Sequence, residues 1–331
     1  MKIAVIGAGA IGALVAGYLS REGVDVTLVG RASDVPVIKD DGLVIDGVRG
    51  NAVVPVKVTD RLEKGFGLVI LTVKTQDINS TLSGNVKALG NAPLLTVQNG
   101  VRAEEIIRGL IPKENIVSSI VMFGSTYLEA GRILHNFEGD WVIGRAFAPN
   151  NGIIDSIGDL LAGAFSVRIT DRITGMKWLK LFLNLNNCLP ALTGRSMQET
   201  FSHPDISCLS IRLLSEALSA VDRAGIELES LPDFPVARLR ALTTMPLAEA
   251  GEIFSKTMTN LSREPLFGSI LQSIKRGKPS EIDYFNGEIV YLGEKIGEDV
   301  TLNKKMVEMV HTVEESGRFL SPGDILNEIG G

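Results

Sequence analysis

The sequence predicts an α/β protein in two parts, a parallel sheet covered by helices followed by an all-α domain. A terminal apolar segment runs directly into the glycine-rich stretch GAGAIG at residues 7–12. Up to about residue 170, short β-branched or apolar runs alternate with helical stretches, as in sheets built with crossover helices. Long amphipathic patterns then replace the strand-like runs. We therefore divide the chain into domains at residues 1–170 and 171–331.

The expected elements follow in order along the chain. Strands are predicted at residues 2–7, 24–30, 68–73, 93–98 and 115–123, which are as apolar as strands buried on both faces should be. Glycine-broken runs at 125–145 predict an antiparallel extension of the sheet, before a helix at 151–163 and a strand at 165–170. The later helices are expected at 172–189, 205–224, 246–260, 280–297 and 302–316, with loops at 228–235 and 275–279.

The composition is that of a folded protein and excludes several classes. Of 331 residues, 45% are hydrophobic and 22% charged, and the net charge of -6 comes without a dense run of Lys or Arg. A nucleic-acid or anionic-membrane partner is therefore not expected. Cys188 and Cys208 form no CxxC pair, which predicts neither a disulfide framework nor a metal site and favours a cytoplasmic location. The apolar run to Leu19 is punctuated by glycines, unlike a secretory leader, and no unbroken stretch could span a bilayer.

The glycine-rich stretch fits GxGxxG between a strand and a helix. It consists of Gly7, Ala8, Gly9, Ala10, Ile11 and Gly12. In that context the first glycine permits a tight turn, the second lets the backbone approach a pyrophosphate, and the third lets helix and strand pack closely. We therefore expect a Rossmann-type dinucleotide site, with a plain glycine-rich turn as the alternative.

The end of the second strand indicates which dinucleotide is bound. Sites that prefer NAD place an Asp or Glu there to bond the ribose hydroxyls, whereas this strand ends in Gly30 and Arg31. A guanidinium can pair bidentately with a 2′-phosphate. Arg31 thus favours NADPH, unless it is merely a surface charge.

Two further strand ends carry polar residues. Lys74 follows the third strand, and Asn99 follows the fourth within Gln98-Asn99-Gly100. Ligands of open α/β sheets gather at these carboxyl ends, so Lys74 could reach the cofactor or substrate and Asn99 could bridge the two. Each taken alone could equally be a solvated loop residue.

The second domain contains a polar helix face and, further along the chain, two acids, Glu281 and Asp283. Lys180, Asn184 and Asn187 have the spacing of one helix face, and Pro190 should break the helix just beyond them. Unpaired burial would be costly, so they should border a cavity or form an interhelical network. Ser280 resembles a helix N-cap that places Glu281 in the first turn, where the helix dipole favours an ionised carboxylate able to hold Lys180 protonated. The competing role for Glu281 is only to interact favourably with the helix dipole.

These motifs together resemble the ketopantoate reductase (2-dehydropantoate 2-reductase) family, within the 6-phosphogluconate-dehydrogenase-like enzymes. The resemblance rests on GAGAIG, Arg31, the TVK ending at Lys74, QNG at 98–100, WLKLFLN at 178–184, SILQ at 269–272 and SEIDYFNG at 280–287. It implies that Lys180 is the general acid, that Glu281 and Ser269 contact substrate, and that Asn99 and Asn184 line the site. It also implies that Gly7, Gly9, Gly12, Arg31 and Lys74 serve NADPH. The family commonly has a second asparagine where this chain has Cys188, which leaves open whether Asn187 or Cys188 takes that place.

The resemblance implies that NADPH reduces the C2 carbonyl of ketopantoate to pantoate, a step of pantothenate and coenzyme A biosynthesis, while Lys180 donates the proton. That chemistry needs Lys180 of one domain to face a nicotinamide held by the other. His135, His203 and His311 lie outside every motif and receive no chemical role. The alternatives are a related 2-oxo acid or 3-hydroxy acid dehydrogenase, or a non-catalytic NADPH-binding sensor. The expected partner is a small 2-oxo acid, and apolar helices leave room for a homodimer.

Overall fold

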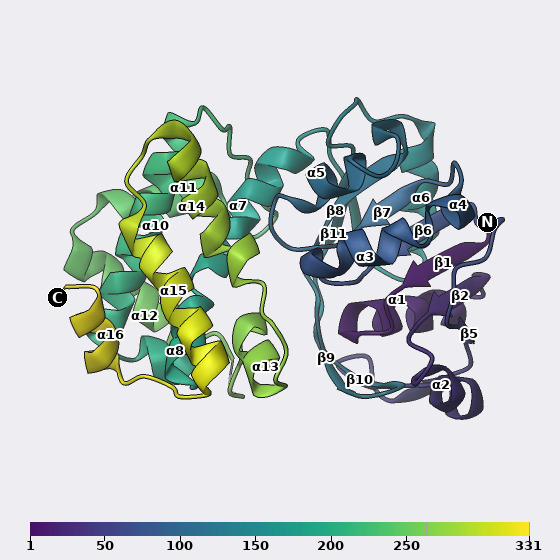
Figure 1. The fold of residues 1–331 in the computed structure, drawn as a ribbon, viewed down its shortest axis with the longest axis horizontal. Helices are drawn as coiled ribbons and strands as arrows, with labels where there is room; N and C mark the ends of the chain where they lie inside the picture. Colours follow the sequence, from purple (N-terminus) through teal and green to yellow (C-terminus); the bar gives the residue numbers. More distant parts are fainter. Residues whose placement is uncertain (263, 331) are drawn as a thin grey trace. The chain divides into compact units, whose positions relative to one another are not determined.

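The structure, a computed structural model, describes residues 1–262 and 264–330, so the last residue of the expected second domain lies outside the described part. The chain forms two compact units, Met1–Thr174 and Gly175–Gly331, each of which is described by itself (Figure 1). The first unit contains both of the sheets formed by the described residues, and the second is helical. The predicted fold class is therefore confirmed.

The first unit is built on an eight-stranded sheet. Its strands, in spatial order, are β12 (Val167–Ile169), β11 (Trp141–Gly144), β8 (Ile116–Val121), β7 (Leu94–Thr96), β6 (Leu68–Leu71), β1 (Ile3–Ile6), β2 (Val26–Val29) and β5 (Lys57–Thr59). The strands from β8 to β5 are parallel, and β11 is antiparallel to β8. In this register Ile6 pairs with both Val29 and Leu71, so three strands end at the same level. The loops that follow these strands therefore meet at one edge of the sheet.

Helices cover both faces of this sheet. Side chains of α1 (Ala10–Arg21), α2 (Val35–Asp41) and α6 (Gly152–Ala162) belong to the core on one face. Those of α3 (Ile78–Ser83), α4 (Val86–Leu89) and α5 (Ala103–Arg108) belong to the core on the other. Short turns η1 (Thr75–Asp77) and η2 (Lys113–Asn115) complete the connections. The strands have cores on both sides, which explains their continuous apolar character.

A second sheet of four strands corrects one prediction. Its order is β4 (Ala52–Val54), β3 (Leu43–Gly47), β10 (Arg132–Phe137) and β9 (Gly124–Glu129). Within residues 125–145 only β11 extends the main sheet, because β10 pairs in parallel with β3 instead. The sheet packs against α1, where a Cβ on Gly17 would come within 2.4 Å of Ile45 Cδ1. Tyr18 Oη lies 2.9 Å from Nδ1 of buried His135, which gives this histidine a structural contact.

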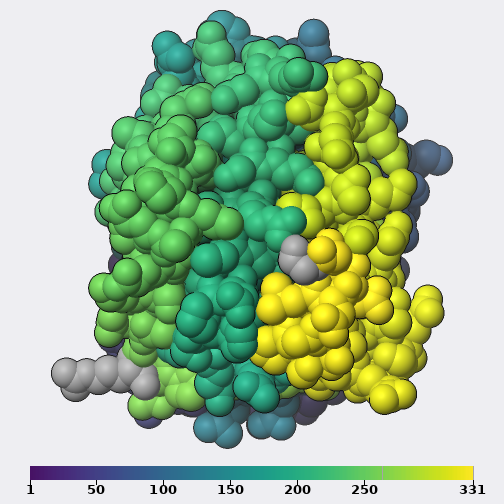
Figure 2. Space-filling view, turned by 90° about the vertical axis from the view of Figure 1, so that its left-hand side faces the viewer, coloured from purple at the N-terminus to yellow at the C-terminus, as the bar shows by residue number. Residues whose placement is uncertain are grey.

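The second unit is a bundle around one long helix. Its elements are α7 (Ile173–Leu185, which begins just before the unit), α8 (Cys188–Thr193), α9 (Met197–Phe201), α10 (Pro204–Arg223), α11 (Val236–Thr244), α12 (Leu247–Thr259), α13 (Ser269–Lys275), η3 (Ile282–Tyr284), α14 (Asn286–Ile296), α15 (Thr301–Ser316) and α16 (Pro322–Glu328). Helix α10 contacts α12, α14, α15 and α16. Figure 2 shows one face, with teal residues flanked by green and yellow ones from later in the chain. None of the described helices is long and apolar enough to cross a membrane.

The predicted helix at 172–189 is wrong at its end. Helix α7 stops at Leu185, and α8 starts at Cys188 with Asn187 as its N-cap. The break thus precedes Pro190, which lies in the first turn of α8, where a backbone N–H has no helical partner to lose. Asn187 is therefore not a third residue on the Lys180 face of α7.

The predicted helix at 280–297 is wrong at its start. Helix α14 begins only at Asn286, after the short turn η3. Fully buried Phe285 has φ of -114° and ψ of -93°, outside the helical region, and so interrupts the helix. Ser280 Oγ accepts from Ile282 N at 3.2 Å, which is a local turn contact, and the acid in the first turn of α14 is Glu288. The helix-dipole argument for an ionised Glu281 therefore fails.

Candidate functional site

The glycine-rich turn after β1 has room only for glycine at two positions. Gly7 has φ of +115°, and a Cβ there would lie 2.7 Å from Thr72 Oγ1. A Cβ on Gly12 would lie 1.8 Å from the carbonyl oxygen of Gly7. At Gly9 a Cβ would meet no atom within 4 Å, so this position faces open space. The turn therefore has the tight bend, close helix packing and open middle that a bound pyrophosphate requires.

The N-terminus of α1 opens onto the same turn. Gly9 is its N-cap, and within the described residues no side chain caps the helix and no acid lies in its first turn. Ala8, Ala10 and Ile11 are partly exposed. Uncapped amides at the positive end of a helix dipole attract anions. The residues present fit the diphosphate of a dinucleotide.

Two polar residues that the sequence reasoning did not assign hold this region together. Thr72 Oγ1, just past β6, donates to the carbonyl oxygens of Ile6 and Gly7, at 2.9 Å each. Gln98 Nε2, just past β7, donates to the carbonyl oxygens of Leu71 and Val73, at 2.9 and 2.7 Å. Both follow apolar strands in the sequence, which is the signal that could have identified them.

Arg31 lies at the carboxyl end of β2, as predicted. The preceding residue, Gly30, approaches the glycine-rich turn closely enough that a Cβ on it would lie 3.0 Å from Ala8 Cβ. Arg31 itself is exposed. Its side chain is therefore accessible to an anionic group bound near the turn.

Lys74 and Asn99 are held in adjacent segments. Lys74 is the N-cap of η1 and Asn99 precedes Gly100, whose φ is +80°. Because Gln98 donates to Val73, the residues directly before Asn99 and Lys74 are joined by a hydrogen bond. Both Lys74 and Asn99 are partly buried. The structure thus brings together the first-unit residues predicted to bind cofactor.

In the second unit, Lys180 has a pKa far below the usual value of a lysine. Burial lowers the pKa of Lys180 to about 7, and the like charge of Lys177, one helical turn earlier, lowers it further. Lys177 is itself buried at 5% exposure. An ammonium with this pKa can donate a proton at neutral pH. Lys177 was not singled out from sequence, although its spacing of three residues before Lys180 signals the shared face.

Asn184 and Asn187 meet despite the helix break. Asn187 Nδ2 donates to Asn184 Oδ1 at 3.4 Å, while Asn184 Nδ2 is buried without a hydrogen-bond partner among the described residues. Asn187 also contacts Gly268, where a Cβ would lie 2.9 Å from its Oδ1. Gly268 directly precedes Ser269, the exposed first residue of α13. Three predicted substrate residues are thus near one another, and a buried unpartnered amide is suited to binding a polar ligand.

Cys188 is not placed to make the polar contact that a second asparagine would make. The residue is fully buried, and burial raises the pKa of its thiol to about 12, although Asn286 hydrogen-bonds to it. Such a thiol is not a nucleophile at neutral pH. Of the two residues left open by the sequence, Asn187 is therefore the one positioned beside Asn184.

Glu281 lies at the start of η3 and is partly buried. Its neighbour Ser280 donates its backbone N–H to Glu314 Oε1 on α15 at 2.8 Å.

Within residues 1–262 and 264–330, no group of three or more His, Cys, Asp or Glu is placed to bind a metal ion.

Comparison with known proteins connects both units to one family. Family models described as ketopantoate reductase PanE/ApbA and its C-terminal part match residues 3–147 and 172–314. The 2-dehydropantoate 2-reductase of Pyrococcus horikoshii is 27% identical, covering 96% of this chain and 99% of that protein. That of Archaeoglobus fulgidus is 25% identical, covering 95% and 98%.

Solved structures show the same fold. A PanE/ApbA family ketopantoate reductase from Ralstonia eutropha has a TM-score of 0.80 at 27% identity, covering 96% of this chain and 99% of that one. D-mandelate dehydrogenase, solved with NADH and anilino(oxo)acetate, has a TM-score of 0.81 at 22% identity with the same coverage. The similarity to D-mandelate dehydrogenase shows the fold alone.

Proposed function

The chain belongs to the ketopantoate reductase family, and we propose that it reduces 2-dehydropantoate to pantoate with NADPH. The observation that carries the proposal is the placement of Lys180 on α7, four residues before Asn184 on the same helix face, with a pKa that burial lowers to about 7 and that suits a proton donor at neutral pH. Matches to the family in both units support it, as does the similarity to named reductases along nearly the whole chain.

The first unit has the residues to bind the cofactor. The turn at Gly7–Gly12 and the uncapped start of α1 would hold the diphosphate, and Arg31 would pair with the 2′-phosphate. Lys74 and Asn99 would contact the nicotinamide end. When bound, the reduced nicotinamide supplies the hydride. Preference for NADPH over NADH rests on Arg31 and on the lack of a carboxylate directly after β2.

The second unit has the residues to bind and protonate a 2-oxo acid. Lys180 Nζ donates a hydrogen bond to the C2 carbonyl oxygen and then gives its proton to the developing alkoxide. The amides of Asn184 and Asn187 orient the substrate, and Ser269 and Glu281 bind its polar groups. Asn184 Nδ2, which is buried without a hydrogen-bond partner within residues 1–262 and 264–330, gains a substrate oxygen as acceptor.

The direct test is an assay of NADPH absorbance with purified protein. Ketopantoate should be reduced with NADPH at a kcat/KM at least about tenfold above that with NADH, as expected for a charge-assisted contact to the 2′-phosphate. Because D-mandelate dehydrogenase has the same fold, phenylglyoxylate and branched aliphatic 2-oxo acids belong in the same assay. A higher kcat/KM for one of those acids would replace ketopantoate as the substrate. Absence of turnover with every acid would favour a non-catalytic NADPH-binding protein.

A further inference from the structure

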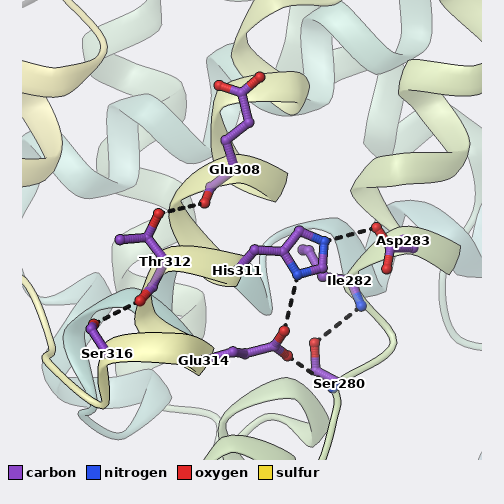
Figure 3. Close-up of polar contacts among 8 residues, drawn as sticks. All are labelled: Ser280, Ile282, Asp283, Glu308, His311, Thr312, Glu314 and Ser316. Carbon is purple, nitrogen blue, oxygen red and sulfur yellow. Dashed lines mark hydrogen bonds and ion pairs between the residues drawn. The ribbon is translucent and has the colours of Figure 1, made fainter.

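His311, a residue without a role in the chemistry above, lies between two carboxylates. It projects from α15, with Nε2 3.0 Å from Asp283 Oδ1 of η3 and Nδ1 3.0 Å from Glu314 Oε2 of its own helix (Figure 3). The imidazole and the Glu314 carboxylate are 41% and 16% exposed. The carboxylate of Glu308, one turn earlier, points away from the imidazole (Figure 3).

The geometry favours the charged imidazole. Ionised carboxylates only accept hydrogen bonds, so holding both contacts requires that both ring nitrogens carry a proton. Desolvation lowers the pKa of His311, but hydrogen bonds and charge from Asp283 and Glu314 outweigh it and raise the pKa above 6.5. Neutral His311 would keep a donor for only one of the two carboxylates.

The same carboxylates fix the backbone around Glu281. Glu314 Oε2 faces His311 while its Oε1 accepts the N–H of Ser280, the residue before Glu281. Ser280 Oγ in turn accepts from Ile282 N, the residue after it. Asp283, two residues beyond Glu281, is the other partner of His311. Ser280 and Asp283, on the two sides of Glu281, are thus tied to α15 by Glu314 and His311, and His311 contacts the carboxylates of both Glu314 and Asp283 (Figure 3).

We propose that His311 is a positioning residue that holds Glu281 at the substrate through Asp283 and Glu314. The proposal rests on the proposed function, because contact between Glu281 and the oxo acid is part of it. His311 touches no reacting atom. Its loss displaces the Ser280–Asp283 segment and weakens substrate binding, with the cofactor site unaffected because that site lies in the other unit.

Steady-state kinetics of H311Q test this, with H203Q as the matched control. His203 also faces an aspartate, with Nδ1 3.9 Å from Asp205 Oδ2 at the start of α10. We expect H311Q to raise KM for ketopantoate about twofold to fivefold, the scale of losing partly exposed charge contacts. KM for NADPH should stay constant, and H203Q should match the wild type. Equal KM values for ketopantoate in H311Q and H203Q would overturn the proposal.

A double variant separates positioning from simple stabilisation. Affinity for pantoate with NADP⁺ present, measured by calorimetry, requires no turnover. H311Q should lower this affinity in the wild type but have no further effect in E281Q, because the two residues act as a unit. Full additivity would contradict the proposal. D283N is the second variant should H311Q not fold, with the same expected loss.

The pH dependence gives an independent readout. In the wild type, KM for ketopantoate should rise as the pH passes above the pKa of His311, and H311Q should lack this rise. An NMR titration of His311 should give a pKa above 6.5 that falls in D283N; a pKa at or below 6.5 would overturn the charged contact. A raised pKa in a protein that does not turn over ketopantoate would mean that the proposed function, and with it the role at substrate, fails while the contact itself is real.

Discussion

The charge of Lys177 lowers the pKa of Lys180, and a single substitution can remove this charge. In the reduction, Lys180 must be protonated, so the rate should fall as the pH rises above its pKa of about 7. Replacing Lys177 by Gln removes the like charge, raises the pKa of Lys180 and should move this fall in kcat to higher pH. Lys177→Arg keeps the charge and should leave the profile in place. A profile unmoved in Lys177→Gln would mean that burial alone sets the pKa.

Gly268 offers a way to displace one amide without disturbing the fold. Its φ of -63° suits any residue, and a Cβ would meet the movable end of Asn187 at 2.9 Å. Gly268→Ala should therefore raise KM for the oxo acid severalfold, leave KM for NADPH unchanged, and alter stability by less than about 1 kcal/mol. Gly84→Ala, where φ is -78° and a Cβ meets open space, is the control. If KM stays constant in Gly268→Ala, Asn187 does not contact the substrate.

Local pattern predicted those residues whose position depends on one element. Arg31 and the glycines of the first turn could be placed because a strand end and a GxGxxG spacing fix where they lie. The roles of Lys177 and Gly268 could not be predicted from the sequence. The effect of Lys177 depends on how deeply it is buried, and that of Gly268 on how closely it approaches Asn187, and tertiary packing sets both.

At the scale of elements, the start of α15 depends on a side chain from another helix. Glu216 of α10 accepts the backbone N–H groups of Leu302 and Asn303, at 2.9 and 2.8 Å, and Nδ2 of Asn303 at 2.9 Å. Glu216→Ala leaves these donors without that acceptor and should lower the free energy of unfolding by about 2 kcal/mol. Urea unfolding followed by circular dichroism measures this. Glu315→Ala, at an exposed position of α15, should change it by less than about 0.5 kcal/mol.

Element boundaries were predicted well where hydrophobic periodicity decides them and poorly where long-range contacts do. The strands at 68–73 and 115–123 and the helices at 205–224 and 302–316 all lie within two residues of their predicted bounds. The pairing of β10 with β3 joins segments far apart in sequence, which no local pattern reveals. The break at Asn186–Asn187 and the non-helical Phe285 likewise interrupt sequences that are periodic enough to read as single helices.

At the scale of the whole molecule, the residues proposed for cofactor and for proton transfer belong to different units, so their substitutions should act on different kinetic constants. Arg31→Ala should raise KM for NADPH about tenfold to hundredfold, the loss of a charge-assisted contact, and leave KM for NADH unchanged. Lys180→Ala should lower kcat about a hundredfold or more without weakening NADPH binding.

A variant that combines Arg31→Ala with Lys180→Ala tests whether cofactor binding and proton transfer are independent. If the two residues act independently, the free-energy effects of Arg31→Ala and Lys180→Ala add within about 0.5 kcal/mol, in NADPH affinity by fluorescence titration and in single-turnover rate alike. If the free-energy effect of the double variant is smaller than the sum of the two single effects, cofactor binding itself sets the protonation or position of Lys180. Loss of NADPH affinity in Lys180→Ala alone would assign this lysine to cofactor binding, and the reduction would then need a different proton donor.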